Sequence, residues 1–188
     1  FAARNRLNQD GEWPLIDPAY GSCIDFGSPM HCHTIEHGYL PSKKYFRKHP
    51  EYYALIDGKR CSDMFFGQVC LSHPDLPELL ISKLKVYILA DEEKAAKSGR
   101  VSPRIYDISM NDSRGFCQCP ECAKKVARYG ESGTLLLVLN QVAAMLKEFR
   151  PDYFLQTLAY FATTSPPRGG VKAMDNMIIR TCNTETYL

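Results

Sequence analysis

Polar and aromatic side chains that could bind or transform a ligand follow several predicted strands of this sequence. In α/β proteins, ligands collect at the carboxyl ends of the strands, where loops vary while strands and helices hold them rigidly. By this rule the candidate site residues are His31 and His33, Asn111 and Asp112, Tyr160, and Asn183 and Glu185. Together they predict one site assembled from several loops.

The pair Asn111-Asp112, after a predicted strand over 105–110, suggests acid catalysis. A carboxyl group that points from a strand end into a cleft is how glycosidases place a general acid, and burial raises its pKa so that a proton remains available near neutral pH. The adjacent amide of Asn111 could orient an acetamido group of a substrate. The same pair followed by Ser113 is also typical of a turn or helix cap, and the residues alone leave both interpretations open.

His31 and His33 are two residues apart, so on an extended chain both imidazoles would share one face. Paired histidines can bind a metal ion or sugar hydroxyls. No carboxylate stands at the spacing of a zinc hydrolase motif, and hydrogen-bonded structural histidines are the other interpretation. From the residues alone, structural histidines are the preferred interpretation and a contact with sugar hydroxyls is the alternative, and no metal is predicted here.

Three of the eight cysteines, Cys117, Cys119 and Cys122, lie close together in the sequence. With Cys70 or Cys61 they could complete a Cys₄ zinc site, but a second CxxC motif is missing. Disulfides, packed thiols and a structural metal therefore remain open, in that order of preference. The prediction includes no metal, and the absence of GxGxxG and Walker motifs indicates no nucleotide cofactor.

Eleven tyrosines and nine phenylalanines are many for 188 residues. Sugar-binding clefts combine flat aromatic faces with a few polar groups, because a pyranose ring presents both C–H surface and hydroxyls. Most of these rings should lie in the core. Tyr160, at the end of the predicted strand 153–161, is the one that we expect in a cleft.

The elements that must hold these residues alternate along the chain. Ser72 and Asp75 at capping-box spacing, with Pro74 in the first turn, predict a helix that starts at Ser72, and apolar residues at helical spacing continue it to about residue 96. The same spacing predicts a second helix over 135–149. Strands are predicted over 22–26, 52–56, 105–110, 153–161 and 177–181, with a hairpin turn at 57–58 and a short helix after Pro41. This alternation favours parallel strands with covering helices.

The predicted fold class is α/β, as one domain over residues 1–188 that forms part of a (β/α)₈ barrel truncated at both ends. A complete barrel usually needs about 250 residues, so this chain would hold only some of its strands. An open doubly wound sheet is the competing arrangement. The first residue is Phe1 and the start lacks the pattern of a signal peptide, so we expect a fragment whose compartment cannot be predicted from targeting.

Composition limits the classes of partner. Apolar residues make up 45% of the chain and charged residues 23%, which is ordinary for a folded domain. No apolar stretch is long enough for a membrane helix. The formal charge is only +2 and evenly spread, which argues against nucleic acid as a partner.

Several short strings occur in an order that resembles the central catalytic region of glycoside hydrolase family 163, formerly a domain of unknown function. The resemblance covers nearly the whole chain. The strings are Arg4-Asn5-Arg6-Leu7-Asn8, His33-Thr34 with Leu40-Pro41, His49-Pro50-Glu51-Tyr52-Tyr53-Ala54-Leu55, Asp57-Gly58-Lys59-Arg60, Cys70-Leu71-Ser72-His73-Pro74, Asn111-Asp112, Phe116-Cys117-Gln118-Cys119 and Leu158-Ala159-Tyr160.

The resemblance implies a barrel related to those of hexosaminidases and α-glucuronidases, and endo-β-N-acetylglucosaminidase activity on complex N-glycans. It implies Asp112 as the general acid, with Asn111 positioning the 2-acetamido group whose carbonyl oxygen attacks the anomeric carbon. Glu185 is the alternative carboxylate. The implied partner is a glycan or glycoprotein, and the implied location is periplasmic or extracellular.

Two alternatives to this retaining hydrolase remain. One is a carbohydrate-binding barrel without catalysis, in which the aromatic and histidine side chains hold the glycan. The other is an inverting hydrolase in which Asp112 is the acid and Glu185 the base, with the two carboxyl groups about 6.5–9.5 Å apart. The sequence does not specify the glycan or the number of subunits.

Overall fold

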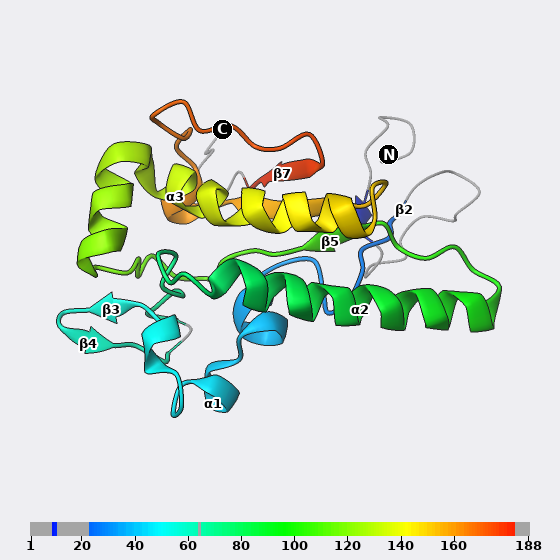
Figure 1. The fold of residues 1–188 in the computed structure, drawn as a ribbon, viewed down its shortest axis with the longest axis horizontal. Helices are drawn as coiled ribbons and strands as arrows, with labels where there is room; N and C mark the ends of the chain where they lie inside the picture. The colour runs from blue at the N-terminus through cyan, green and yellow to red at the C-terminus, as the bar shows by residue number, and fades with distance from the viewer. Residues whose placement is uncertain (1–8, 11–22, 64, 183–188) are drawn as a thin grey trace.

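A three-stranded parallel sheet packed against two long helices organises the chain (Figure 1). The computed structural model describes residues 9–10, 23–63 and 65–182. Along the chain, α2 (Leu76–Ser98) precedes β5 (Ile105–Asp107), and α3 (Pro120–Phe149) connects β5 to β6 (Phe154–Ala159). A loop without an α-helix leads on to β7 (Met177–Thr181). The sheet has the order β5-β6-β7, which confirms the predicted parallel α/β arrangement.

Further parallel pairing extends this arrangement on the side of β5. Two short strands, β1 (Gln9–Asp10) and β2 (Cys23–Ile24), pair in parallel, and Phe26 just beyond β2 forms a parallel bridge to Ile105. Among the described strands that pair in parallel, neighbours therefore follow the order of the sequence, while β3 and β4 stand outside this sheet. A doubly wound sheet would reverse its order at a switch point. The described strands form an open sheet and show no closure into a barrel.

The shorter predicted elements are largely present. The helix expected after Pro41 is α1 (Ser42–Tyr45), and the hairpin around Asp57-Gly58 joins β3 (Leu55–Ile56) to β4 (Lys59–Arg60). Part of the predicted strand 52–56 is instead a 3₁₀ turn over Pro50–Tyr52, because Pro50 favours the first position of a helical turn. The hairpin lies apart from the main sheet in Figure 1.

Two details of the predicted helices are wrong. The expected capping box fails because α2 begins at Leu76, and its N-cap Asp75 makes no side-chain capping hydrogen bond. Helix α3 starts 15 residues earlier than predicted, at Pro120, and bends at Gly130, whose φ of 74° is unfavourable for other residues. The polar sequence before the bend hid its helical character because no apolar stripe runs along it.

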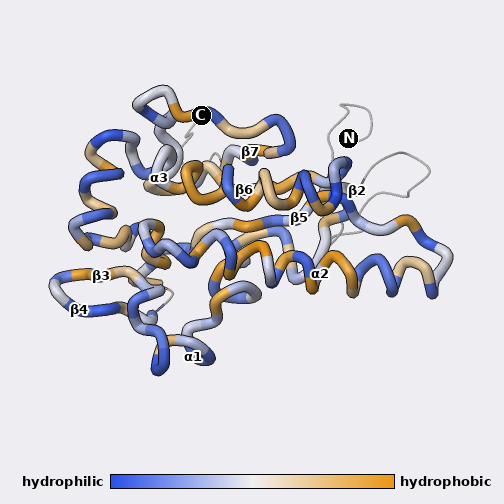
Figure 2. The backbone as a smooth tube through the Cα atoms, in the orientation of Figure 1, coloured by the Kyte–Doolittle hydropathy of each residue, from blue (hydrophilic) through white to orange (hydrophobic). Residues whose placement is uncertain are grey.

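The hydrophobic core lies between the two helices and the sheet. Figure 2 shows apolar and polar residues alternating along α2 and α3, as expected for helices with one buried face. The central side chains are fully buried: Leu80, Leu84 and Ile88 from α2, Leu139, Val142 and Leu146 from α3, and Tyr106 and Leu155 from the sheet. The predicted helical spacing of these leucines is thereby confirmed.

A polar contact joins the ends of the two helices. Arg150 forms a bidentate pair with Glu92, at 2.8 Å and 2.9 Å, and the Tyr153 hydroxyl donates to the same carboxylate at 2.8 Å. These donors lower the pKa of Glu92. The contact fixes where α3 stops and β6 begins. Among the described residues, no helix combines the length and apolar character of a membrane span.

Leu139→Ala tests the core. Removing this fully buried side chain should reduce the free energy of unfolding by about 2–5 kcal/mol, because it loses apolar contacts and leaves a cavity between α3 and its neighbours. Leu137→Ala, on the same helix at a half-buried position, is the matched control and should cost clearly less. Urea unfolding measures both, and equal losses would contradict this packing.

Candidate functional site

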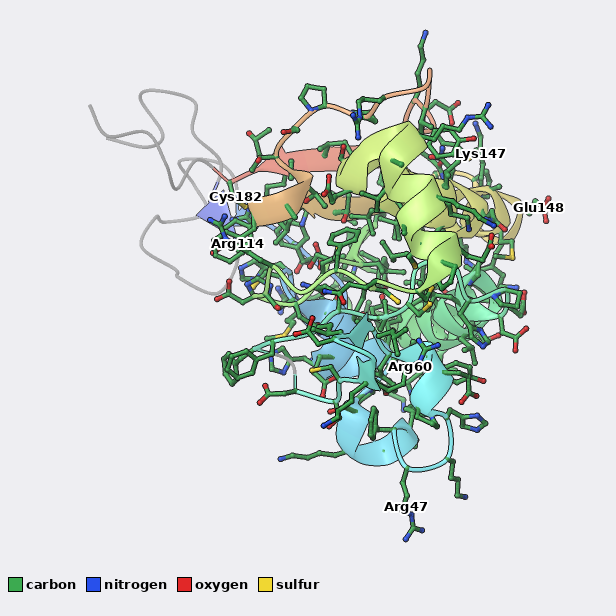
Figure 3. The ribbon with its side chains drawn as sticks, turned by 90° about the vertical axis from the view of Figure 1, so that its left-hand side faces the viewer. Arg47, Arg60, Arg114, Lys147, Glu148 and Cys182 are labelled. Atoms are coloured by element: carbon green, nitrogen blue, oxygen red, sulfur yellow. The ribbon has the colours of Figure 1, made fainter. Side chains whose placement is uncertain are left out.

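The carboxyl ends of β5, β6 and β7 open onto the side of the molecule that faces the viewer in Figure 3. Parallel register brings these ends to one edge, where Asp107 stands opposite Gln156 and Ala159 opposite Thr181. Arg114 and Cys182, both labelled in Figure 3, lie on this side, and each interacts electrostatically with Tyr160. Loops after three strands thus contribute to one region.

At the centre of this region is Asp107, a buried carboxylate that the sequence analysis missed. It is the last residue of β5 and is completely inaccessible to solvent. Its Oδ1 lies 3.0 Å from the Thr34 hydroxyl and also accepts from the Ser109 hydroxyl, while Oδ2 accepts from Gln156 Nε2 at 2.9 Å. The position inside a predicted strand concealed it, because an isolated acid among apolar residues carries no spacing signal.

Burial raises the pKa of Asp107 to about 6. Removing a carboxylate from water disfavours its charged form, and here this outweighs the hydrogen bonds from Ser109, Gln156 and Thr34 and the nearby His31, which all lower the pKa. Asp107 therefore titrates close to neutral pH. Since its oxygens are enclosed by protein donors, it can hold neighbouring groups but cannot touch a substrate.

The two histidines do not share one face as expected from an extended chain. Residues 31–33 form bends that lead into a π-helical turn, Ile35–Tyr39, and His33 has a positive φ of 51°. His31 stacks on Phe26, with ring centroids 5.5 Å apart. The expectation fails because Thr34 is drawn to Asp107 and Ser109, which turns the backbone away from a strand.

His33 nevertheless faces the strand-end region. Its Nδ1 lies 2.9 Å from the carbonyl oxygen of Met110, which only accepts, so Nδ1 carries a proton and Nε2 is the acceptor of the neutral ring. The His33 and Tyr160 ring centroids are 5.9 Å apart. Two of the predicted site residues are therefore brought together from segments far apart in the sequence.

Tyr160 also meets the carboxylate of Asp112. The pKa of Tyr160 is raised, first by burial and then by the nearby Asp112 carboxylate. Asp112 itself is exposed. Tyr160 further stacks on Phe161, at 4.0 Å between ring centroids, and Arg114 lies over the other ring of this pair at 4.8 Å. An exposed acid, a phenol and an aromatic surface thus adjoin one another.

The side-chain amide of Asn111 is engaged within the protein. Its Nδ2 donates to the carbonyl oxygen of Gly67 at 3.1 Å, and its Oδ1 accepts from the backbone N–H of Glu36 at 3.3 Å. The side chain is buried, so both ends of the amide serve contacts within the protein. In this arrangement Asn111 holds the loop in place.

Gln68 fixes the backbone on both sides of Asp112. Its Nε2 donates to the carbonyl oxygens of Asn111 and Ser113, each at 2.8 Å, and its Oε1 accepts from the N–H of Asn111 at 2.9 Å. These hydrogen bonds explain why β5 ends before the predicted residue 110. The backbone groups that follow β5 bond to side chains instead of to a neighbouring strand. Asp112 is exposed, and its two buried neighbours, Asn111 and Ser113, are held by hydrogen bonds to Gln68.

Two exposed phenylalanines adjoin this loop and were not anticipated. Phe65 and Phe66 are each 69% exposed. The backbone here approaches so closely that a Cβ at Gly115 would lie 1.7 Å from the Phe66 carbonyl oxygen, so only glycine fits. Contiguous exposed apolar surface can mark a binding site, so this pair is a candidate for contact with a ligand. The dipeptide Phe-Phe before a glycine was the only available sequence signal.

A small pocket lies between the two strand-end loops. It is lined by Gln68, Met110, Asn111, Ser113, Phe116, Leu158, Tyr160, Phe161, Ala162 and Thr163. The lining includes the predicted residues Asn111 and Tyr160. The other predicted candidates at the end of β7, Asn183 and Glu185, lie outside the described residues.

The raised pKa of Asp107 predicts a specific dependence of stability on pH. Because the folded-state pKa of about 6 exceeds the unfolded value, the folded protein binds the proton more tightly, and the stabilisation present below pH 4 is lost as pH rises through 6. We expect the stability of the wild type relative to Asp107→Asn to fall by about 2 kcal/mol between pH 4 and 7. Urea unfolding across this range measures the difference.

Asp175→Asn is the control, because the contribution of Asp175 to stability should change with pH in the opposite direction to that of Asp107. Asp175 pairs with Lys147 at 2.6 Å, which lowers its pKa, so its contribution appears as pH rises. A difference between wild type and Asp107→Asn that is constant with pH would contradict the buried, proton-binding state of Asp107.

Comparison with known proteins places the chain in a family. A family model described as "Domain of unknown function (DUF4838)" matches residues 2–187. Comparisons with curated proteins and with solved structures gave no match. Because the match spans nearly the whole sequence, including every strand-end residue discussed above, the chain belongs to the DUF4838 family.

Proposed function

We propose that the chain is the central part of a glycoside hydrolase barrel that cleaves a β-linked N-acetylglucosamine in complex N-glycans. The observation that carries this proposal is the exposed Asp112, whose two neighbours are held by Gln68 and whose carboxylate lies near Tyr160 at the carboxyl edge of a parallel sheet. The ordered sequence strings that resemble glycoside hydrolase family 163 support the same function.

Strand order supports the barrel. The parallel neighbours follow the sequence from β1 and β2 through β5 and β6 to β7, as successive strands of a (β/α)₈ barrel do. In such barrels the active site lies at the carboxyl ends of the strands. A complete barrel needs further strands, which would surround the strand-end region that carries Asp112.

The proposed mechanism uses one protein carboxyl group and the acetamido group of the substrate. Asp112 donates its proton to the glycosidic oxygen as the bond to the anomeric carbon breaks, and the acetamido carbonyl oxygen forms a new bond to that carbon. Asp112, now a carboxylate, accepts a proton from the water that opens this intermediate. Two displacements at one carbon give a product that retains the configuration of the substrate.

The neighbouring residues have supporting roles in this proposal. The phenol of Tyr160 lies near the Asp112 carboxylate and helps to orient it, and His33 presents a ring nitrogen to substrate hydroxyls. Phe65 and Phe66 offer exposed rings against which sugar C–H faces can stack. Asn111 is a positioning residue that holds the acid's loop, since its amide is engaged within the protein.

A carbohydrate-binding protein without catalysis is the second candidate. It is favoured by the solvent exposure of Asp112, because a general acid in a formed active site is usually desolvated. In that case the aromatic rings and His33 hold the glycan and the carboxylate accepts hydrogen bonds from hydroxyls. An inverting hydrolase with Glu185 as base is the third. For each, the proposed partner is a glycan or glycoprotein and the proposed location periplasmic or extracellular.

Asp112→Asn tests the general acid. On a glycoprotein with a poor leaving group, kcat/KM should fall by about 10²–10⁴, because no proton is delivered to the departing oxygen. On an aryl glycoside with a good leaving group the loss should be much smaller. The released sugar is identified by mass, with Asp57→Asn as the control at an exposed acid outside the site. Equal losses on both substrates would contradict acid catalysis, and unchanged glycan affinity without turnover in the wild type would favour the binding protein.

The configuration of the first product tests the acetamido mechanism. We expect the β-anomer, observed by NMR before mutarotation, because substrate-assisted attack displaces twice at the anomeric carbon. An α-anomer would instead support inversion with a second carboxylate such as Glu185.

A further inference from the structure

Four cysteine thiols meet at a point between α2, α3 and the β3–β4 hairpin. Cys70 precedes α2, Cys117 and Cys119 precede α3, and Cys122 lies in the first turn of α3. Their sulfur atoms all lie within 4.8 Å of one another. Three of the four residues are buried and Cys119 is partly exposed. All four are free thiols.

The distances fit a tetrahedral metal centre. Zinc–sulfur bonds of about 2.3 Å place any two sulfurs of a Cys₄ site about 3.8 Å apart. The Cys70 sulfur lies 3.7 Å from that of Cys119 and 3.8 Å from that of Cys122. A disulfide would require a separation of about 2.0 Å. Packing of thiols in a core would not by itself bring four sulfur atoms this close together.

Donors surround the sulfurs as they do around thiolates. The backbone N–H of Leu55 points to the Cys117 sulfur at 3.2 Å, and that of Cys122 to the Cys119 sulfur at 3.5 Å. Arg60, in β4 of the same hairpin and labelled in Figure 3, adds a positive charge near Cys70. Four thiolates around Zn²⁺ carry a net charge of −2, which these donors and the positive end of α3 partly offset.

We propose that Cys70, Cys117, Cys119 and Cys122 bind a structural zinc ion. Each thiol releases its proton to solvent as its sulfur bonds to Zn²⁺, which keeps its oxidation state. With four protein ligands the ion has no open position for substrate, so its role is structural. It joins the starts of both long helices to the hairpin, and it ends the loop that carries Asp112. The sequence offered only half of this motif, because Cys70 lies far from CxCxxC along the chain.

Metal analysis of the whole purified chain, prepared under reducing conditions, tests this proposal. We expect about one zinc per chain by mass spectrometry. Cys119→Ser and Cys70→Ser should each lower this content severalfold, whereas Cys61→Ser should leave it unchanged. Cys61 is the matched control, since it lies at the end of the same hairpin with its thiol toward the Asp63 carbonyl at 3.7 Å.

Two measurements on the wild type keep the test independent of variant folding. Cobalt exchange should produce the visible absorption of tetrahedral Co²⁺ with thiolate ligands. Chelation should lower Tm by at least about 5 °C, and added Zn²⁺ should restore it. Folded protein with less than about a tenth of an equivalent of zinc, one iron per chain, or disulfides among these four cysteines would each overturn the proposal.

Discussion

The buried carboxylate of Asp107 is the interaction on which the arrangement of the strand-end region depends. Its two oxygens accept from Thr34, Ser109 and Gln156, which come from three separate segments of the chain. An unpaired buried carboxylate would be very costly, so these segments must converge for the fold to form. The contact of Thr34 with Asp107 brings the preceding loop, which contains His33, to the sheet, and Gln156 fixes β6 beside β5. The proximity of His33 to Tyr160 follows from this convergence.

The sequence predicted the framework well because apolar periodicity reports directly on burial. Leu80, Leu84 and Ile88 lie in the core as their spacing indicated, and β7 has the predicted bounds. Prediction failed where side chains replace backbone partners. The strand expected through Met110 stops at Asp107, because Thr34 and Gln68 accept the N–H groups of Ser109 and Asn111. Such contacts join residues far apart in sequence and have no local pattern.

The same limit explains which residues of the candidate site could be predicted from the sequence. Tyr160, Asp112 and His33 could be chosen because each follows a predicted strand or lies in a polar cluster. Asp107 and Gln68 could not, since each is a lone polar residue among apolar neighbours, and their importance arises only from burial and partners. The cysteine cluster lies between these cases. Its CxCxxC half was visible, but choosing Cys70 over Cys61 required the positions of the helix starts.

The backbone of the loop from Ile108 to Cys119 is held in place at three points. Asp107 and Ser109 hold its start, Gln68 holds the residues on either side of Asp112, and the cysteine cluster holds its end. Between such anchors the backbone at residue 112 has little freedom, so little conformational entropy is lost when its side chain engages a ligand. A loop held only at its two ends would lose more conformational entropy each time it bound a ligand. Under the function proposed above, the buried polar contacts behind Asp112 serve to place that acid accurately, because an apolar core would stabilise the fold without them.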